Sequence, residues 1–161
     1  MDKAAMLKAY IRQLPKDELI DLFISTMRKE EHEDRIPVSI FKAPLSTLEL
    51  VVKYMKEELG YSNKKIALTL NRSAQNIWIT YRNAKEKHPA KLEIRKSVHD
   101  IPVSVFADKE LSTLESAASY LKKKGMDADE IAKILHRSRN TIVTVLDRAG
   151  KKFLMRNGND K

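Results

Sequence analysis

The 161-residue chain contains no cysteine, four glycines and one tryptophan. The absence of thiols excludes disulfides and thiolate metal sites, and it suits a reducing compartment. With so few glycines, there is no glycine-rich loop that could cradle a phosphate. No apolar run approaches the ~20 residues of a membrane-spanning helix. The first residues, which include Asp2, lack the apolar segment of a signal peptide. We therefore expect a cytoplasmic protein.

Residues that commonly perform catalysis are sparse as well. No histidine has a second ligand-type residue at a spacing typical of a metal site, and we expect His32 to face solvent. No pair of carboxylates lies in an apolar sequence context. We therefore expect no enzymatic activity, no metal and no cofactor.

Basic residues, by contrast, are abundant and unevenly placed. The net charge is +9 within a composition that is 42% hydrophobic, enough for globular cores. Residues 1–35 hold 7 basic and 8 acidic side chains, residues 36–90 hold 9 and 4, and residues 91–161 hold 15 and 10. The excess after residue 35 favours a polyanionic partner, because Lys and Arg displace counterions from phosphates. From charge alone, a solvated surface explains it equally well.

The segment Asn63–Lys87 has the pattern of a helix, a tight turn and a second helix. Ala67 is the small residue that lets two helices approach, and Asn71 tolerates the left-handed conformation that the turn needs. Ser73 is placed to cap the second helix, and Ile77 anchors it inward. Its outward face would then be free to enter a DNA major groove.

This pattern belongs to a longer duplicated unit. IPVSIF at residues 36–41 recurs as IPVSVF at 101–106, and LSTLE at 45–49 recurs at 111–115. The period is about 65 residues, which indicates a tandem duplication. In the second copy, Asp127–Lys152, the equivalent places are taken by Ala132, His136, Ser138 and Ile142. His136 is a poorer residue for the turn than Asn71.

Each unit should contain a support helix before its helix-turn-helix segment. The capping-box pattern S-x-x-E at residues 46–49 and 112–115 predicts a helix of about twelve residues. Each helix should end near a glycine in the left-handed conformation, Gly60 in one unit and Gly125 in the other. The IPVSIF segment contains Pro37, which disfavours a central strand, so we expect an extended strap over the helices.

Two amphipathic helices are predicted before the repeats. Apolar residues recur with helical period over residues 3–14 and 16–28, with Pro15 between them. They predict a helical hairpin whose second helix carries more apolar surface than one partner helix would cover. The hairpin is expected either to dock on the rest of the chain or to pair with a second copy. The charged run at residues 29–35 predicts a linker.

The sequence therefore predicts an all-α protein. Residues 91–98 alternate enough for a short strand, and an irregular linker is equally consistent with them. The expected segments are a helical hairpin at 1–30, a first helix-turn-helix unit at 36–88, a linker at 89–100, a second unit at 101–155 and a disordered tail at 156–161.

The blocks IPVSIF, LSTLE, YSNKKIALTLNRS and NIWITYRNAKEK resemble the promoter-reading C-terminal region of bacterial sigma factors, called region four. Over residues 36–155 the chain looks more closely like the stand-alone tandem sigma-region-four-like proteins of archaeal-type genomes. The resemblance implies that the second helix of each unit binds DNA. No segment resembles the aromatic-rich, promoter-melting helices of a sigma factor, so regulatory or accessory binding is implied rather than promoter opening.

Base contacts are expected on the outward faces of the two second helices. An amide can pair with adenine, Arg can pair with guanine, and an exposed Ile can meet a thymine methyl. Trp78 is expected to pack against the support helix instead. The candidates are Gln75, Asn76, Ile79, Arg82 and Asn83 in the first unit, and Asn140, Thr141, Thr144 and Arg148 in the second.

Phosphate contacts are expected around the turns. Arg72 and Arg137 recur just before a capping serine, where a recognition helix approaches the DNA backbone. Asp147 shares the second outward face and would be repelled by phosphate unless it pairs with Lys151 or accepts from cytosine N4. The second unit is therefore the less certain of the two to read DNA bases. The candidates are Lys64, Lys65, Arg72, Ser73, Arg137, Ser138, Arg139 and Lys151.

These observations predict a sequence-specific, nucleoid-associated DNA-binding protein, most simply a transcription regulator. Its expected partners are double-stranded DNA and a second copy bound through residues 1–30. Two other functions stay open: an accessory factor that binds RNA polymerase or another protein with incidental DNA contact, and an architectural binder indifferent to sequence. The differing outward faces of the two units argue against the architectural binder.

Overall fold

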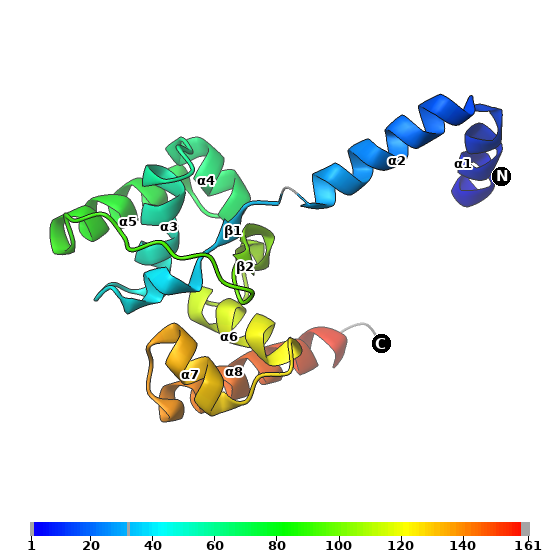
Figure 1. Ribbon diagram of the computed structural model, residues 1–161. Coiled ribbons are helices and arrows are strands. Elements are labelled where there is room, and N and C mark those ends of the chain that lie inside the picture. The colour runs from blue at the N-terminus through cyan, green and yellow to red at the C-terminus, as the bar shows by residue number, and fades with distance from the viewer. Residues whose placement is uncertain (1, 32, 159–161) are drawn as a thin grey trace. The chain divides into compact units, whose positions relative to one another are not determined.

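The computed structural model of the chain describes residues 2–31 and 33–158, without the side chains of residues 25–31 (Figure 1). This part is predominantly helical, with eight α-helices, two 3-10 helices and one pair of two-residue strands, which confirms the all-α class. It divides into two compact units, Met1–Asp34 and Arg35–Lys161. The expected exposure of His32 falls outside the described residues. None of the described helices is long and apolar enough to cross a membrane.

The N-terminal unit consists of α1 (Lys3–Gln13) and α2 (Lys16–Glu31). The two predicted helices are present, but they do not pack into a hairpin. Figure 1 shows them meeting end to end, and α1 buries no residue. Apolar side chains of both helices are exposed, including Leu7 and Phe23.

The second helix also continues past its expected end. It runs through Glu31, into the charged segment 29–35 that was predicted as a linker. Lys and Glu are good helix formers, so a run such as Lys29 to Glu31 extends a helix already begun rather than ending it. The connection between the two units is correspondingly shorter than predicted.

The C-terminal unit contains the two sequence repeats, folded in the same order of elements. The first repeat comprises β1 (Arg35–Ile36), the 3-10 helix η1 (Val38–Lys42), α3 (Thr47–Glu57), α4 (Asn63–Leu70) and α5 (Ala74–Lys87). The second comprises β2 (Ile101–Pro102), the 3-10 helix η2 (Val103–Ala107), α6 (Thr113–Lys123), α7 (Ala128–Leu135) and α8 (Arg139–Gly158).

The support helices α3 and α6 begin and end as predicted, because both capping boxes are formed. In the first box, Ser46 Oγ accepts from the Glu49 N–H at 3.2 Å, and Glu49 Oε2 accepts from the Ser46 N–H at 2.9 Å. Beyond the helices, Gly60 and Gly125 have φ angles of 67° and 91°. Glycine adopts this left-handed region without steric cost.

The expected straps are only partly extended. Ile36 and Ile101 lie in the short strands, but the next residues coil into η1 and η2. In the first strap, the neighbours Ile40 and Phe41 are both buried. A strand would direct two adjacent side chains to opposite faces, so burying both requires the chain to turn.

One open alternative is decided and one expectation is corrected. Residues 91–98 form no strand, and the linker alternative is the one found. Ser39 of η1 holds this linker, since its Oγ donates to the Glu93 carbonyl at 2.9 Å and accepts from the Arg95 N–H at 2.8 Å. The tail predicted as disordered at 156–161 is helical through Gly158, because α8 continues that far. Residues 159–161 lie outside the described part.

The two repeats share one hydrophobic core. The strand β1 pairs antiparallel with β2, and Ile36 lies opposite Ile101, both fully buried. The helices α3 and α6 contact each other, while η1 packs on α7 of the other repeat and η2 packs on α4. The strap of each repeat therefore covers a helix of the other repeat.

Candidate nucleic-acid interface

The turn between α4 and α5 has the backbone geometry that the sequence predicts. Asn71 adopts φ 56° and ψ 47°, and His136 adopts φ 51° and ψ 48° at the equivalent place between α7 and α8. Both angles lie in the left-handed region, which Asn and His enter more readily than most residues do. The small residues expected where the helices touch, Ala67 and Ala132, are both buried.

The serines expected as N-caps act as caps. Ser73 Oγ accepts from the Asn76 N–H at 3.2 Å, and Ser138 Oγ accepts from the Thr141 N–H at 3.1 Å. Each bond satisfies one backbone donor that the helix itself leaves unpaired. The start of each second helix is thereby fixed, and the phosphate contacts predicted for these two serines stay predictions.

In the first repeat, α5 is held against α3 by a cluster of polar groups around one carboxylate. Glu57 Oε1 accepts from Lys53 Nζ at 2.9 Å, from Lys85 Nζ at 3.1 Å and from the Tyr81 hydroxyl at 3.1 Å. The side chain of Lys53 is 0% exposed. The Lys53–Glu57 pair lies within α3, and it presents the Glu57 carboxylate to Tyr81 and Lys85 of α5.

A second ion pair holds the far end of α5. Lys87 Nζ donates to Glu49 Oε1 at 2.6 Å, and Glu49 is the carboxylate of the α3 capping box. The second repeat uses the same device, with Lys152 Nζ donating to Glu115 Oε2 at 2.7 Å. One carboxylate thus caps the support helix and also fixes the end of the second helix.

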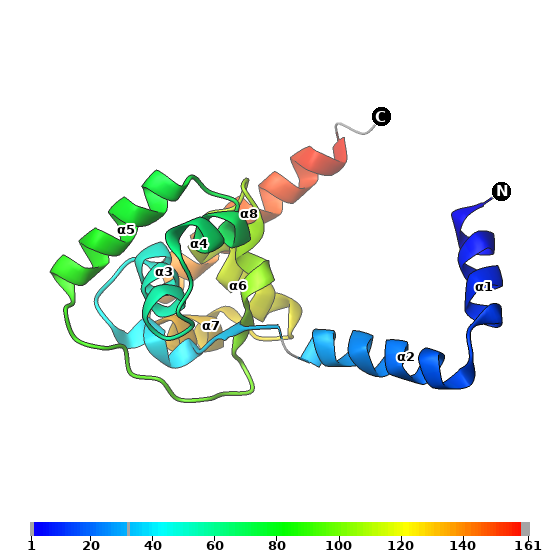
Figure 2. The same ribbon diagram turned by 90° about the horizontal axis from the view of Figure 1, so that it is seen from above.

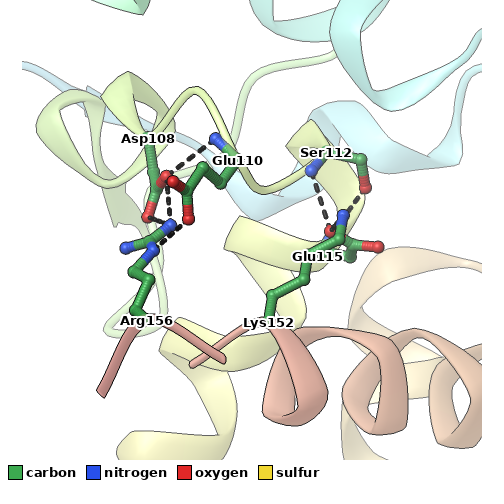
Figure 3. A network of polar contacts seen from close by, with 6 residues as sticks. All are labelled: Asp108, Glu110, Ser112, Glu115, Lys152 and Arg156. Carbon is green, nitrogen blue, oxygen red and sulfur yellow. Dashed lines mark hydrogen bonds and ion pairs between the residues drawn. The ribbon is translucent and has the colours of Figure 1, made fainter. Parts of the chain in front are cut away.

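The second repeat adds a further clamp. Figure 3 shows Arg156 of α8 directed at Asp108 and Glu110, in the segment that precedes α6. Arg156 Nη2 lies 2.7 Å from Asp108 Oδ1 and 2.9 Å from Oδ2, while Nε contacts Glu110. This clamp explains why the helix persists into residues expected to be disordered.

The shifted pKa values follow from these contacts. Burial would raise the pKa of Glu57, but the hydrogen bonds from Lys53 and Lys85 outweigh burial and bring the pKa below its ordinary value. The same balance lowers the pKa of Glu49, where burial is opposed chiefly by the hydrogen bond from Lys87. Both carboxylates are therefore ionised at neutral pH, as the ion pairs require.

The predicted base-contacting residues of the first repeat lie together on the exposed side of α5. Figure 2 shows α5 along the outer edge of that repeat. Its inward side chains, Ile77 and Ala84, are fully buried. The outward set is exposed in every case: Gln75, Asn76, Ile79, Arg82 and Asn83.

The single tryptophan belongs to the exposed side as well. Trp78 is 50% exposed, which is more than the expected packing against α3 would leave. The guanidinium of Arg82 lies 5.6 Å from the centre of its ring, within the range of a cation–π contact. Arg82 also pairs with Glu86 at 3.1 Å, and both side chains are well exposed. Exposed pairs of this kind are weak, so Arg82 can leave Glu86 for a stronger partner.

The outward side of α8 is more committed to contacts within the chain. Thr144 Oγ1 donates to the Asn140 carbonyl at 2.9 Å, and the hydroxyls of Ser138 and Thr141 lie 2.8 Å apart. Arg148 is exposed. Asn140, Thr141, Thr144 and Arg148 were predicted to contact bases, and their spacing along α8 places them on one face.

The predicted phosphate contacts of the second repeat also have partners in the chain. Arg139 pairs with Asp129 at 3.1 Å, and Lys151 pairs with Asp147 at 2.9 Å. The latter pair is the one that was expected to mask the charge of Asp147. Arg137 donates hydrogen bonds to three backbone carbonyls.

The cations of the first repeat that were predicted to contact phosphate are less engaged. Within residues 2–31 and 33–158, no carboxylate pairs with Lys64, Lys65 or Arg72. Lys65 stacks over the ring of Tyr61 at 3.5 Å from its centre. Of the cations predicted to contact phosphate, those of the first repeat are therefore less engaged within the chain than those of the second.

Sequence reasoning missed the ion pairs that position the second helices. Lys87 and Lys152 occupy matching places in the two repeats, as Glu49 and Glu115 do. Because both members of the pair recur, the sequence could have indicated this ion pair. The cluster around Glu57 had no such signal, since the second repeat has Lys123 at the matching position.

Comparison with protein-family models, curated proteins and solved structures finds no match to this chain. The resemblance to sigma-factor region four thus rests on the sequence motifs alone and stays a prediction.

Proposed function

We propose that this protein binds double-stranded DNA sequence-specifically through two tandem helix-turn-helix units and regulates transcription. One observation carries the proposal. The helix α5 exposes a largely polar face that includes Ile79, while ion pairs at Glu57 and Glu49 hold its other side on α3. A rigid helix with a free polar face is what reading of base edges in a major groove requires.

The chemistry of this face suits base recognition. The amides of Gln75 and Asn76 lie on the first turn of α5, where a recognition helix comes nearest to the bases. Amide side chains pair with adenine through two hydrogen bonds, and Arg82 can do the same with guanine. Ile79, 41% exposed, offers an apolar surface to a thymine methyl. In this proposal α5 is the principal reader.

The surrounding charges would supply affinity that does not depend on sequence. Lys64 and Lys65 lie at the start of α4, and Arg72 lies in the turn before α5. Because carboxylates do not neutralise them in the described part of the chain, they can neutralise phosphates. In the second repeat, Arg139 and Lys151 are paired with carboxylates and Arg137 donates to backbone carbonyls, so this repeat would bind more weakly.

The experiment is a titration of the full-length chain with duplex DNA selected from a random pool. Each neutralised phosphate should contribute a slope of about −0.9 to the plot of log K against log salt. The selected site should also bind more tightly than random duplex at the same salt concentration. Absence of binding at low salt would overturn the proposed function.

A second candidate function is an accessory factor that binds another protein, such as RNA polymerase. The observation that favours it is the apolar surface of α1 and α2, where Ile20 is 55% exposed and Phe23 is 64% exposed. Exposed apolar groups in such number are typical of a protein-binding surface. Substitution of Phe23 by Ser should abolish such an interaction and leave DNA affinity unchanged, which separates the two functions.

A further inference from the structure

The two repeats follow each other in the same direction along the chain, yet they face each other in space. Ile36 and Ile101 are the first residues of IPVSIF and IPVSVF, and they lie opposite each other in an antiparallel strand pair. Equivalent residues can pair in this way only if a local twofold rotation relates the two copies. A simple translation of one repeat along the chain would not bring them together.

The packing around the strands has the same reciprocity. The segment η1 of the first repeat packs on α7 of the second, and η2 of the second packs on α4 of the first. The equivalent support helices α3 and α6 contact each other. Such an exchange of matching surfaces is the mark of an isologous interface, which a twofold axis generates.

The two turns before the recognition helices flank one cleft on this axis. The cleft has a volume of about 530 Å3, and both Arg72 and Arg137 line it, together with the capping residues Ser46 and Ser112. Arg137 also donates to the Leu45 carbonyl of the first repeat at 3.1 Å. The first turns of α5 and α8 therefore start on opposite sides of the same cleft.

We infer that the DNA site of this protein is an inverted repeat of two adjoining half-sites, although its reading units are direct repeats in the sequence. The inference rests on the proposed function. Helices related by a twofold axis meet the duplex in opposite orientations, because the two DNA strands are related by twofold axes as well. The two half-sites should adjoin, because the turns that precede the two recognition helices line the same cleft.

The two reading faces carry different residues, so the natural half-sites should differ in sequence. Their relative orientation could then not be recognised from the selected sequence alone. The outward residues Gln75, Asn76, Ile79, Arg82 and Asn83 of α5 correspond to Asn140, Thr141, Thr144, Asp147 and Arg148 of α8. A variant that carries the α5 face on both helices should read the same half-site twice. It is made by Asn140→Gln, Thr141→Asn, Thr144→Ile, Asp147→Arg and Arg148→Asn.

The experiment selects duplexes from a random pool with the full-length wild type and with this five-residue variant. The variant should select one motif twice, in opposite orientations, with a short fixed spacing. The same motif in direct orientation would overturn the inference and leave the proposed function intact, and so would a single motif alone. If the wild type selects no DNA at all, the proposed function fails and the inference with it.

A measurement on the wild type tests a premise of the inference, namely that both reading helices contact one duplex in a fixed relative orientation. One half-site of the selected duplex is reversed in orientation while its composition and position are kept. Affinity should fall at least about tenfold, because the contacts of one reading helix are lost. Unchanged affinity for the reversed site would contradict any fixed arrangement of the two helices, the inverted one included.

Discussion

Arg137 of the second repeat donates a hydrogen bond from Nη2 to the carbonyl oxygen of Leu45 in the first repeat, at 3.1 Å. Its Nη1 donates to the carbonyls of His136 at 3.1 Å and Leu135 at 3.4 Å. One guanidinium thus holds its own turn and the neighbouring repeat at the same time. A residue predicted from the sequence as a phosphate contact has a structural task as well.

Replacement of Arg137 by Ala should therefore lower the free energy of unfolding by about 1.5–3 kcal/mol, the usual range for hydrogen bonds that involve a charged group. Urea denaturation measures the difference. Arg139→Ala is the matched control, because Arg139 makes only an exposed ion pair with Asp129, and its effect should stay within about 0.5 kcal/mol. Equal effects of the two substitutions would show that the contact with Leu45 does not stabilise the fold.

Substitutions on α5 should separate reading of bases from binding of phosphate. Gln75→Ala and Arg82→Ala should each cost about 1–3 kcal/mol of affinity for the preferred site and little for random DNA, whereas Arg72→Ala should weaken both about equally. The loss of the Arg82–Glu86 pair adds little, because both side chains are exposed. Competition titrations at fixed salt give the ratio of specific to random affinity. A ratio unchanged by Gln75→Ala and Arg82→Ala would exclude the first unit as the reader.

Removal of the Glu57 carboxylate should strongly destabilise the protein. Glu57→Ala leaves the ammonium of Lys53 buried without its ion-pair partner, a change that typically costs about 3–5 kcal/mol. The double replacement Lys53→Met and Glu57→Leu should recover most of this loss, because two apolar side chains need no partner. Thermal and urea unfolding test both variants. If Glu57→Ala were as stable as the wild type, the Lys53 ammonium would have to reach water.

Stability should fall in acid. The pKa values of Glu49, Glu57 and Glu115 lie below the ordinary 4.5, because hydrogen bonds from lysines overcome the opposing effect of burial. A carboxyl whose folded pKa is lowered contributes its full stability above the unfolded pKa. That contribution is lost as the pH falls from about 4.5 through the lower folded value.

The measurement is the free energy of unfolding over a series of pH values, for the wild type and for Glu49→Gln. The variant should be less stable than the wild type at neutral pH, and the difference should shrink towards low pH. A constant difference at every pH would contradict the assigned role of the ionised carboxylate.

Residues 1–30 are predicted to join two copies of the chain. Ile11, Leu19, Ile20, Leu22 and Phe23 line an apolar cleft of about 510 Å3 on α1 and α2, and a second copy would present the same apolar surface. Analytical ultracentrifugation at tens of micromolar, roughly the range where weak assemblies form, should detect the dimer. Phe23→Ser should return it to a monomer. A monomeric wild type at this concentration would refute the prediction.

Much of the local structure could be predicted from the sequence, because local chemistry decides it. Ser46, Ser73 and Ser112 cap helices where the patterns indicated, and Asn71 and His136 take the left-handed conformation. Each of these outcomes depends on a few neighbouring residues.

Apart from the run of α2 through Glu31, the errors arose where distant residues decide the outcome. The polar sequence from Arg156 onward predicted a disordered tail, but Asp108 and Glu110, more than 45 residues away in the sequence, bind Arg156 and hold the end of α8 in place. The pairing of Ile36 with Ile101 is likewise invisible to periodicity, since a single repeat gives no sign of which surface will cover its strap. For the candidate site, the sequence identified the exposed face of α5 but not the ion pairs at Glu57 that position it.

Both repeats lie on one chain, so the pairing that exchanges their straps is independent of protein concentration. In an ordinary dimeric regulator, dilution separates the subunits, and the pair must form again before DNA is bound. Here the linker that Ser39 fastens through Glu93 and Arg95 joins the two repeats, so that their association is intramolecular and their effective concentration is fixed by the linker. Under the proposed function, a single molecule would present both reading helices at once, even where only a few copies are present.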